Sequence, residues 1–502
     1  MTPRPPPGSA DSYGGALDQV SAAGRGQDLL LVVNPGDEHA LRIANAYQQL
    51  RHIPDHNIVF IEPPRPDGFL DMSLDEQQFS ETIVRPVARA IQERGLSGQI
   101  DFIGALGLPV RFNFDNPGNF GSTHHQSLSY GLTELNQYAA GLAAAEAQFV
   151  PTALSARDPR EAIHNSQTHV VTYNGGISRE THYYVGGLIA YSGSFGNAVD
   201  QVIANLQRTA AADGARPGGT IYFEQNDNIR SSIREGQWPA VQDALRARGI
   251  PLVEESDIPG ATPQGRSDVR GAVVGAADLT LPNGSTYLPG SWADHLTSYG
   301  GAFGPAQTKA TEFIAAGAAA TSGTVEEPYA IADRFPAASI FLAIDDGLTL
   351  GESFYRNVRR PDMIQFIGDL LAQPYADLPH VEFPDSPADE QTVSGSVSLD
   401  ARATLTSPRF ASAIDRLELY VDGLLRDTIR ADLGTFRLDT TSLADGRHEL
   451  RVLAVNNAAA QSEGLAIREF RLGAGLLRVP DTVEEQALRR AIRVLREEVA
   501  RC

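Results

Sequence analysis

The sequence predicts an α/β protein that carries a small all-β domain and a helix near its carboxyl end. Two observations predict the α/β part: short, wholly apolar runs that end in turn residues, and stretches of helical period between them. A third predicts the β domain, because apolar residues after position 385 alternate with period two between turn signals. The length of 502 residues suits roughly three domains.

The first half of the α/β part is expected at residues 27–180. Its first strand is the apolar run 29–33, which ends at Asn34-Pro35-Gly36 as a strand buried on both faces does. A βαβ unit follows from the pattern of the next thirty or so residues. The expected elements are, in order, a strand at 29–33, a helix around 40–50, a strand at 58–61, a helix opened by a capping box of Ser73 and Glu76, a strand at 100–105 and an Ala-rich helix at 133–148.

The second half is expected at residues 181–385, where the alternation of helical and apolar segments resumes. The expected elements are a helix at 195–211, a strand at 220–223, a helix at 238–248, a strand at 269–274 and a helix at 308–316. Alternating strands and helices build mostly parallel sheets, so the two halves can share one continuous sheet.

Beyond Phe383-Pro384 the pattern indicates an immunoglobulin-like β-sandwich at 386–474, with a hairpin turn at Asp422-Gly423. Residues 475–502 are expected to form an amphipathic helix with one apolar stripe, made of Leu488, Ile492, Leu495 and Val499. The stripe either packs on its own sandwich or docks on another chain. In the second case Cys502 could form an intermolecular disulfide and the protein would be an oligomer.

Composition and charge exclude several classes of function. The net charge of −21 repels phosphate backbones, so nucleic acid is not expected as a partner. The single cysteine, Cys502, leaves no intrachain disulfide, cysteine-based metal site or internal thiol nucleophile. No apolar run is long enough to span a membrane, and residues 1–26 are expected to be a disordered leader without a signal peptide. Either the protein stays inside the cell, or a signal has been trimmed.

Ligands of α/β sheets collect where strands end, so the segments that follow the expected strands are the candidate sites. The first such segment contains Gly107, Pro109 and Asn113 and leads to His124-His125. Adjacent histidines reach one metal only on irregular backbone, because consecutive side chains diverge on helices and strands. Two solvated imidazoles on a surface loop are therefore the preferred interpretation, and no metal or other cofactor is expected.

The second candidate segment runs from Gly275 and Ala276 to Ser291, Asp294 and His295. The last three are the residue types of a hydrolase triad, although their spacing on a helix would set them side by side. The alternative is that Ser291 caps a helix whose first turn carries Asp294. Glu327, one of two adjacent carboxylates in a third segment, is a further candidate acid or base.

Several stretches resemble an uncharacterised family of bacterial proteins that are generally predicted to be exported: LLLVVNPGDEHALRIANAYQQLRHIPDHNIV, FIGALGLPVRF, GSWADHLTSYGG, EFIAAGAAATSGTVEEPY and GLTLGESFYRNV. That family is distantly similar to the gingipain-type cysteine peptidases, which have a caspase-like fold in two subdomains followed by an immunoglobulin-like module. The resemblance covers about residues 29–380. It implies a caspase-like mixed sheet with flanking helices, and a secreted or surface location.

In those peptidases a histidine ends one strand and the catalytic cysteine ends the next. By resemblance, the first position falls at Gly275-Ala276-Ala277 and the second at Gly290-Ser291, so both catalytic side chains are missing. A serine hydroxyl without a base is a poor nucleophile. The leading hypothesis is a non-catalytic protein that binds a protein or peptide ligand. The alternative is a hydrolase centred on Ser291, Asp294 and His295.

Overall fold

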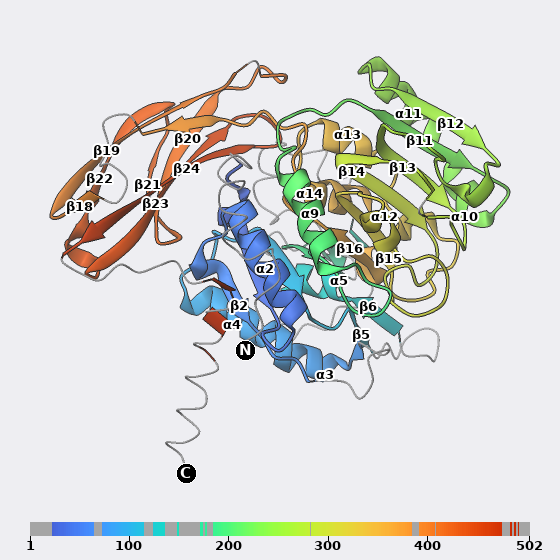
Figure 1. The fold of residues 1–502 in the computed structure, drawn as a ribbon, viewed down its shortest axis with the longest axis horizontal. Helices are drawn as coiled ribbons and strands as arrows, with labels where there is room; N and C mark the ends of the chain where they lie inside the picture. Colours follow the sequence, from blue (N-terminus) through green and yellow to red (C-terminus); the bar gives the residue numbers. More distant parts are fainter. Residues whose placement is uncertain are drawn as a thin grey trace, which may run out of the picture.

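A computed structural model describes the chain over residues 23–64, 73–114, 124–135, 148–149, 171–173, 176–177, 184–281, 283–383, 391–406 and 408–473, together with residues 482, 483, 486, 487 and 490. An α/β domain lies beside a C-terminal β-sandwich (Figure 1). No helix within this part of the chain is both long and apolar enough to cross a membrane.

The α/β domain is built on one ten-stranded mixed sheet that contains both expected halves. Its strands, from one edge to the other, are β12 (Leu252–Ser256), β11 (Thr220–Gln225), β13 (Val269–Gly275), β14 (Tyr287–Leu296), β15 (Ala320–Thr324), β16 (Ile364–Gly368), β10 (Val185–Leu188), β4 (Phe102–Leu106), β1 (Leu29–Val33) and β2 (Ile58–Phe60). The strands β2, β1, β4 and β10 pair in parallel, whereas β15 and β16 pair in antiparallel fashion.

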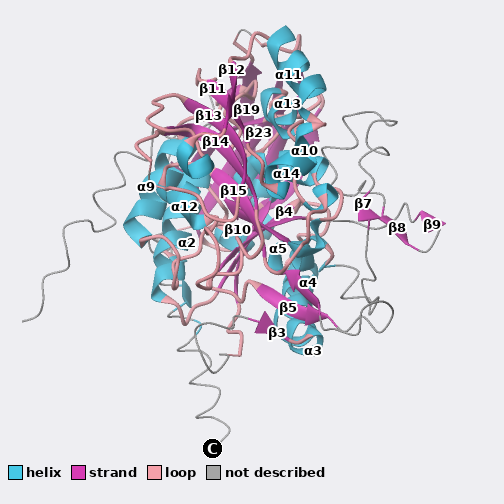
Figure 2. Cartoon of the chain, turned by 90° about the vertical axis from the view of Figure 1, so that its right-hand side faces the viewer, coloured by secondary structure: helices cyan, strands magenta, loops and turns pink. Residues whose placement is uncertain are grey.

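Helices cover both faces of this sheet (Figure 2). One face carries α2 (Glu38–Arg51), α9 (Val199–Ala210) and α12 (Thr311–Ala315). The other carries α4 (Arg85–Glu93), α5 (Leu128–Thr133), α10 (Ile229–Glu235), α11 (Trp238–Ala247), α13 (Ile340–Asp345) and α14 (Leu350–Asn357). Because the central strands are buried on both faces, β1 and β4 are wholly apolar or small, as the sequence predicts.

Two small sheets complete the α/β part. One consists of β3 (Ser73–Leu74), β5 (Arg111–Phe114) and β6 (His124–Ser127), and the other of β7 (Gln148–Phe149), β8 (Val171–Tyr173) and β9 (Gly176–Ile177). The capping box expected at Ser73 and Glu76 is wrong, because Asp75 and Gln78 form it and open α3 (Glu76–Phe79) two residues later. The expected helix at 133–148 lies largely outside the described residues.

The C-terminal sandwich has two sheets, as the period-two pattern predicts. One contains β17 (His380–Glu382), β19 (Ser396–Thr404) and β22 (Leu433–Asp439), and the other β18 (Gln391–Val393), β24 (Glu463–Leu472), β23 (Gly446–Asn456), β20 (Ile414–Val421) and β21 (Leu424–Ile429). The hairpin between β20 and β21 turns at Asp422-Gly423, and both residues have positive φ, as such two-residue turns require. The sandwich begins before residue 386, since β17 pairs with β19.

The amino-terminal segment is ordered earlier than expected. Residues 23–26, assigned to a disordered leader, are buried, and Ala23 forms a β-bridge with Gly464 of the sandwich. The Arg25 guanidinium donates to Asp28 at 3.1 Å and to the carbonyl of Ala460 at 3.1 Å, and it lies 3.6 Å from Glu463. This buried cation therefore ties the segment before β1 to the sandwich.

The described residues after 473 include Val483, which packs on the α/β domain. Val483 is fully buried in the core that α2 contributes to, and its amide donates to the side chain of Asn45 at 3.2 Å. This contact concerns Val483 alone, so the partner of the apolar stripe stays a prediction. The apolar stripe of Leu488, Ile492, Leu495 and Val499 lies outside the described residues, as does Cys502.

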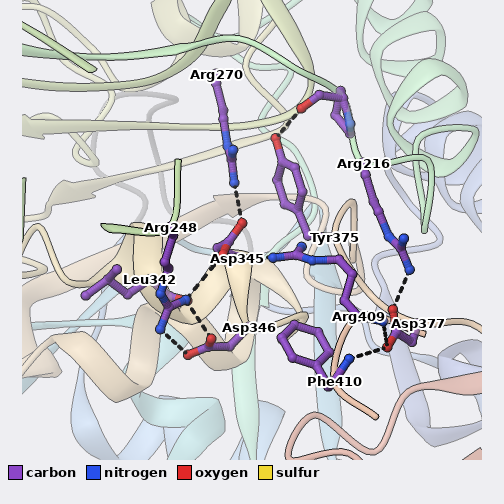
Figure 3. A network of polar contacts seen from close by, with 11 residues as sticks. Arg216, Arg248, Arg270, Leu342, Asp345, Asp346, Tyr375, Asp377, Arg409 and Phe410 are labelled. Carbon is purple, nitrogen blue, oxygen red and sulfur yellow. Dashed lines mark hydrogen bonds and ion pairs between the residues drawn. The ribbon is translucent and has the colours of Figure 1, made fainter. Parts of the chain in front are cut away.

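A second junction between the two domains consists of carboxylates surrounded by arginines (Figure 3). Asp345, at the end of α13, accepts hydrogen bonds from Arg270 at 2.8 Å and from Arg409 of the sandwich at 3.0 Å, and Arg248 adds a third at 3.3 Å. Burial alone would raise the pKa of Asp345, but the arginines outweigh it and lower that pKa. Asp345 is therefore ionised across the physiological range.

We expect Asp345→Asn to lower the free energy of unfolding by about 2–3 kcal/mol, because the substitution removes the charge of a buried carboxylate that accepts hydrogen bonds from three arginines. Asp346→Asn is the matched control, since the neighbouring carboxylate is 41% exposed and pairs with Arg248 at the surface. Its cost should stay below about 1 kcal/mol. Urea unfolding of both variants measures the difference, and equal costs would contradict a dominant role for Asp345.

Candidate functional site

The parallel strands β1, β4 and β10 bring their carboxyl ends to one edge of the sheet. Gly104 of β4 pairs with Leu31 of β1 on one side and with Gly187 of β10 on the other. The chain leaves β1 through α2 on one face and reaches β4 through α4 on the opposite face (Figure 2). β2 and β4 therefore lie on opposite sides of β1, so the strand order reverses at β1. Such a reversal opens a crevice at the carboxyl ends of the strands, which is where open α/β sheets bind ligands.

A cavity of about 630 Å³ occupies this crevice, and we refer to it as the α2 cavity. Its volume lies in the range of about 300–1,000 Å³ that small-molecule sites have. Its walls are segments that follow β1, β2, β4 and β10, and they include Asn34, Gly36, Asp37, Glu38, His39, Ala40, Pro63, Pro64, Leu106, Gly107, Leu108, Pro109, Leu188, Ala190, Tyr191, Ser192, Gly193 and Ser194. Gly107 and Pro109, both predicted from the sequence as cleft residues, are among them.

Asn34 and Gly107 shape the floor of the α2 cavity. The Asn34 side chain donates to the carbonyl of Gly107 at 2.9 Å and accepts from the amide of Gly36 at 2.9 Å, so it joins the two strand-end loops. Gly107 has φ of +69°, and a Cβ there would lie 2.8 Å from the side chain of Ala40. Only glycine fits this turn without strain.

The electrostatics of the α2 cavity favour cations over anions. Asp37 caps α2, and its carboxylate accepts from the amides of His39 at 2.9 Å and Ala40 at 3.2 Å. The amide groups that would otherwise attract an anion at this helix end are therefore already paired with a carboxylate. Glu38 adds a second acidic side chain. Burial, and then the negative charge of Asp37, raise the pKa of Tyr191 on the opposite wall.

The α2 cavity also contains the residue types of a hydrolase: Asp37, His39, Ser192 and Ser194. A catalytic relay needs a hydroxyl bonded to a histidine that a carboxylate orients. Asp37 instead caps its own helix, and no hydrogen bond within the described part of the chain joins His39 to either serine. The arrangement offers polar groups for binding and no assembled nucleophile.

The predicted centre of Ser291, Asp294 and His295 lies elsewhere, and the expected helix there is wrong. These residues belong to β14, whose side chains alternate between the two faces of the sheet. Ser291 and His295 face the side of α12, where the His295 ring contacts Phe313, whereas Asp294 faces α10. Along an extended strand, Ser291 and His295 are about 13 Å apart. The structure does not bring the three together.

Each of these three side chains has a place in the core. Asp294 pairs with Arg234 of α10, and burial raises the pKa of Asp294 although Arg234 opposes the shift. The Nε2 of His295 donates to the carbonyl of Ala276 at 2.8 Å. Ser291 is 2% exposed. The partners of Asp294 and His295 are distant in sequence, so a local pattern cannot reveal why a strand carries these two polar groups, and the Ser291 hydroxyl has no hydrogen-bond partner among the described residues.

The position that the resemblance assigned to a cysteine, Gly290-Ser291, does not end its strand. β14 continues to Leu296, and Thr297 and Ser298 follow it. The other assigned position is placed as expected, because β13 ends at Gly275 and Ala276 follows. Neither Gly275 nor Ala276 lines the α2 cavity, and Gly275 packs against the backbone of Arg230 in α10.

The remaining candidates are also dispersed. Glu327 lies beyond the end of β15 and accepts from the amide of Tyr329, whereas Ser291 contacts the residue just before β15 begins. Asn113 pairs with His125 across β5 and β6, and neither lines the α2 cavity. The amide of His125 donates to Glu326 at 2.5 Å, while the side chain of His124 lies outside the description. Among the described residues, no cluster of three or more His, Cys, Asp or Glu side chains could hold a metal.

Sequence reasoning missed Asn34, Tyr191, Ser192 and Ser194. Asn34 lies in the turn that follows the first expected strand, so its position at a strand end could be predicted from the sequence. The other three follow β10, which was not predicted as a strand because Gly186 and Gly187 interrupt its apolar run. Those glycines are needed since a Cβ at Gly186 would lie 2.4 Å from the carbonyl of Ser129. An apolar run with internal glycines, followed by Tyr-Ser-Gly-Ser, is the signal that could have located them.

Comparison with known proteins assigns the C-terminal domain alone. Residues 379–452 match the family described as bacterial Ig domain. No curated protein sequence matches the chain. Among solved structures, the fibronectin(III)-like modules of CbhA from Clostridium thermocellum are 16% identical, with a TM-score of 0.16, over 24% of this chain and 57% of that one, so the chain spans little more than half of that structure.

Two further similarities are of the same order. A superoxide reductase (neelaredoxin) from Ignicoccus hospitalis is 15% identical with a TM-score of 0.15, over 19% of this chain and 80% of that one. An endo-β-1,4-mannanase from Thermotoga petrophila is 11% identical with a TM-score of 0.16, over 55% of this chain and 50% of that one. Similarities this low carry no argument about function. The chain is therefore a mixed α/β protein with a C-terminal domain that matches a bacterial Ig domain.

His295 should make stability depend on pH. Burial lowers the pKa of its imidazole to about 3, and the hydrogen bond to Ala276 opposes this only in part. Between pH 6.5 and 3 the unfolded chain binds a proton that the folded protein does not, so stability is lost as the pH falls, by about 1.4 kcal/mol per pH unit from this group.

We expect His295→Gln, which keeps a donor but does not titrate, to flatten this part of the profile of unfolding free energy against pH. His39→Gln is the matched control at an exposed histidine and should leave the slope unchanged. Denaturant unfolding at a series of pH values gives the slopes. A wild-type slope in His295→Gln would mean that other groups carry the acid sensitivity.

Proposed function

We propose that this protein is a non-catalytic, caspase-like binding protein of the cell surface or the exported fraction, and that it binds a peptide ligand in the α2 cavity. The observation that carries the proposal is the cavity itself: a ligand-sized space at the reversal of strand order, lined by polar groups with no assembled nucleophile. The sequence of a mixed α/β domain followed by an Ig-like domain supports the gingipain-like arrangement and the external location.

The strand ends of the second half support the non-catalytic assignment. After β13 stands Ala276, where the resemblance implies a histidine, and Ser291, which by the resemblance takes the place of the cysteine, is buried inside β14. The nearest imidazole, that of His295, has its pKa lowered to about 3 by burial, so it is a poor proton acceptor at neutral pH. Among the described residues, the Ser291 hydroxyl has no hydrogen-bond partner, and so no base that would activate it.

A peptide suits the chemistry of the α2 cavity. Apolar surfaces come from Pro63, Pro64 and Pro109, and hydroxyl groups from Tyr191, Ser192 and Ser194. The acidic pair Asp37 and Glu38 favours a positively charged group such as an amino terminus. The capped end of α2 disfavours phosphate, which makes a nucleotide ligand a poorer fit.

A bulky side chain at the wall should abolish binding. Ser194 lines the α2 cavity and is exposed, so Ser194→Trp fills the space without disturbing the core. Ser398→Trp, at an exposed position of the sandwich strand β19, is the matched control. Purified protein is incubated with an equimolar tripeptide mixture, and the retained and cleaved peptides are identified by mass spectrometry.

We expect the wild type and Ser398→Trp to retain the same subset of peptides and Ser194→Trp to lose it. None of the three proteins should cleave a peptide. Equal retention by Ser194→Trp and the wild type would place binding outside the α2 cavity and overturn the proposal. Cleavage that His39→Ala removes would instead favour a hydrolase built from Asp37, His39 and a serine of the same cavity.

A further inference from the structure

A second, smaller cavity adjoins the α2 cavity, and we refer to it as the Lys309 cavity. It has a volume of about 250 Å³ and is lined by Val110, Arg111, Tyr191, Tyr299, Ala302, Phe303, Gly304, Pro305, Ala306 and Lys309. Tyr191 lines both cavities, and its ring stacks on Phe303 at 3.7 Å between centroids. At this volume the Lys309 cavity is too small for a whole drug-sized ligand, so it suits one end of a longer one.

The two cavities carry opposite charge. Among the residues that the structure describes, the charged side chains that line the α2 cavity are the carboxylates of Asp37 and Glu38. In the described part of the chain the Lys309 cavity has the opposite lining, with Arg111 and Lys309 as its charged side chains and no aspartate or glutamate.

Lys309 is the only lysine in the sequence and is 4% exposed. Its ammonium donates to the carbonyl of Tyr299 at 2.7 Å and to that of Ala306. An ammonium has three donors, so these two bonds leave one. Within the described part of the chain, no carboxylate lies within ion-pair distance of Nζ. Burying a cation without a counter-charge is costly, and a bound anion would offset that cost.

The pKa of Lys309 is lowered, as expected for a buried ammonium without a carboxylate beside it in the described part of the chain. Burial lowers it to about 8, and no neighbouring carboxylate raises it back. Arg111 adds a second positive charge to the same lining, with its Nη1 donating to the carbonyl of Val325 at 3.0 Å. The walls of Tyr191, Tyr299 and Phe303 supply aromatic surface beside these cations.

We propose that the Lys309 cavity binds the terminal carboxylate of the peptide whose amino-terminal part occupies the α2 cavity. The inference rests on the proposed function. It orients the peptide with its amino-terminal part in the α2 cavity and its carboxyl end in the Lys309 cavity, with Tyr191 lining both. A single carboxylate with an apolar side chain matches the two cations and the aromatic walls, whereas a dianionic phosphate would be repelled by the acidic side chains of the adjoining cavity.

The single lysine makes the test specific. Protein grown with ¹³C,¹⁵N-lysine gives side-chain NMR signals from Lys309 alone, because no other position is labelled. The probes are the tripeptide Ala-Ala-Phe with a free carboxylate and the same tripeptide as its carboxamide. We expect the acid to shift the Lys309 Cε and Nζ signals and to bind about ten- to a hundredfold more tightly than the amide, the fold-change equivalent to a hydrogen bond between charged groups.

Two results would overturn the inference: Lys309 signals that do not shift with millimolar acid, or equal affinity for the acid and the amide. Lys309→Met should remove the preference for the acid, while Arg85→Gln, which neutralises an exposed arginine of α4, should keep it. If Lys309→Met fails to fold, the comparison of the acid and the amide on the wild type still tests the inference. A shift at Lys309 that Ser194→Trp leaves intact would refute the α2 cavity as the peptide site and spare the carboxylate site.

Discussion

The parallel alignment of β1, β4 and β10 is the constraint on which the candidate site depends. Parallel strands deliver every following segment to one edge, so Asn34, Gly107 and Tyr191 meet there although up to 157 residues separate them in sequence. The two glycines of β10 allow α5 and the side chains around Phe366 to pack directly against its backbone. Larger side chains at those positions would push the strand out of line and disperse the cavity walls.

The sequence predicted much of the fold because the relevant signals were local. The apolar strand at 29–33, the helix that follows it and the turn at Asp422-Gly423 each depend on residues within a few positions. β14 was missed because Ser291, Asp294 and His295 are polar residues typical of a loop or a helix start. Only their partners Arg234 and Ala276, which are distant in sequence, make such a strand stable.

Less of the candidate site could be predicted, because a cavity depends on which strands are neighbours. Gly107 and Pro109 were identified as strand-end residues, and a strand end is a local feature. Lys309 is the only lysine of the sequence, but nothing near it in sequence indicates that Tyr191 lines the same cavity. The order of strands across the sheet, with β10 beside β4, comes from long-range pairing that no motif records.

The β-bridge between Ala23 and Gly464 joins the two domains at a point other than the chain connection between them. The segment before β1 is clasped by the Ig-like domain through this bridge and through Gln27, whose side chain donates to the carbonyl of Gly423 at 2.8 Å. An Ig-like domain joined only by a linker could be removed without disturbing its neighbour. Here its removal would expose the segment before β1 and take the Ala460 carbonyl and Glu463 away from the buried Arg25, so we expect the two domains to fold as one unit.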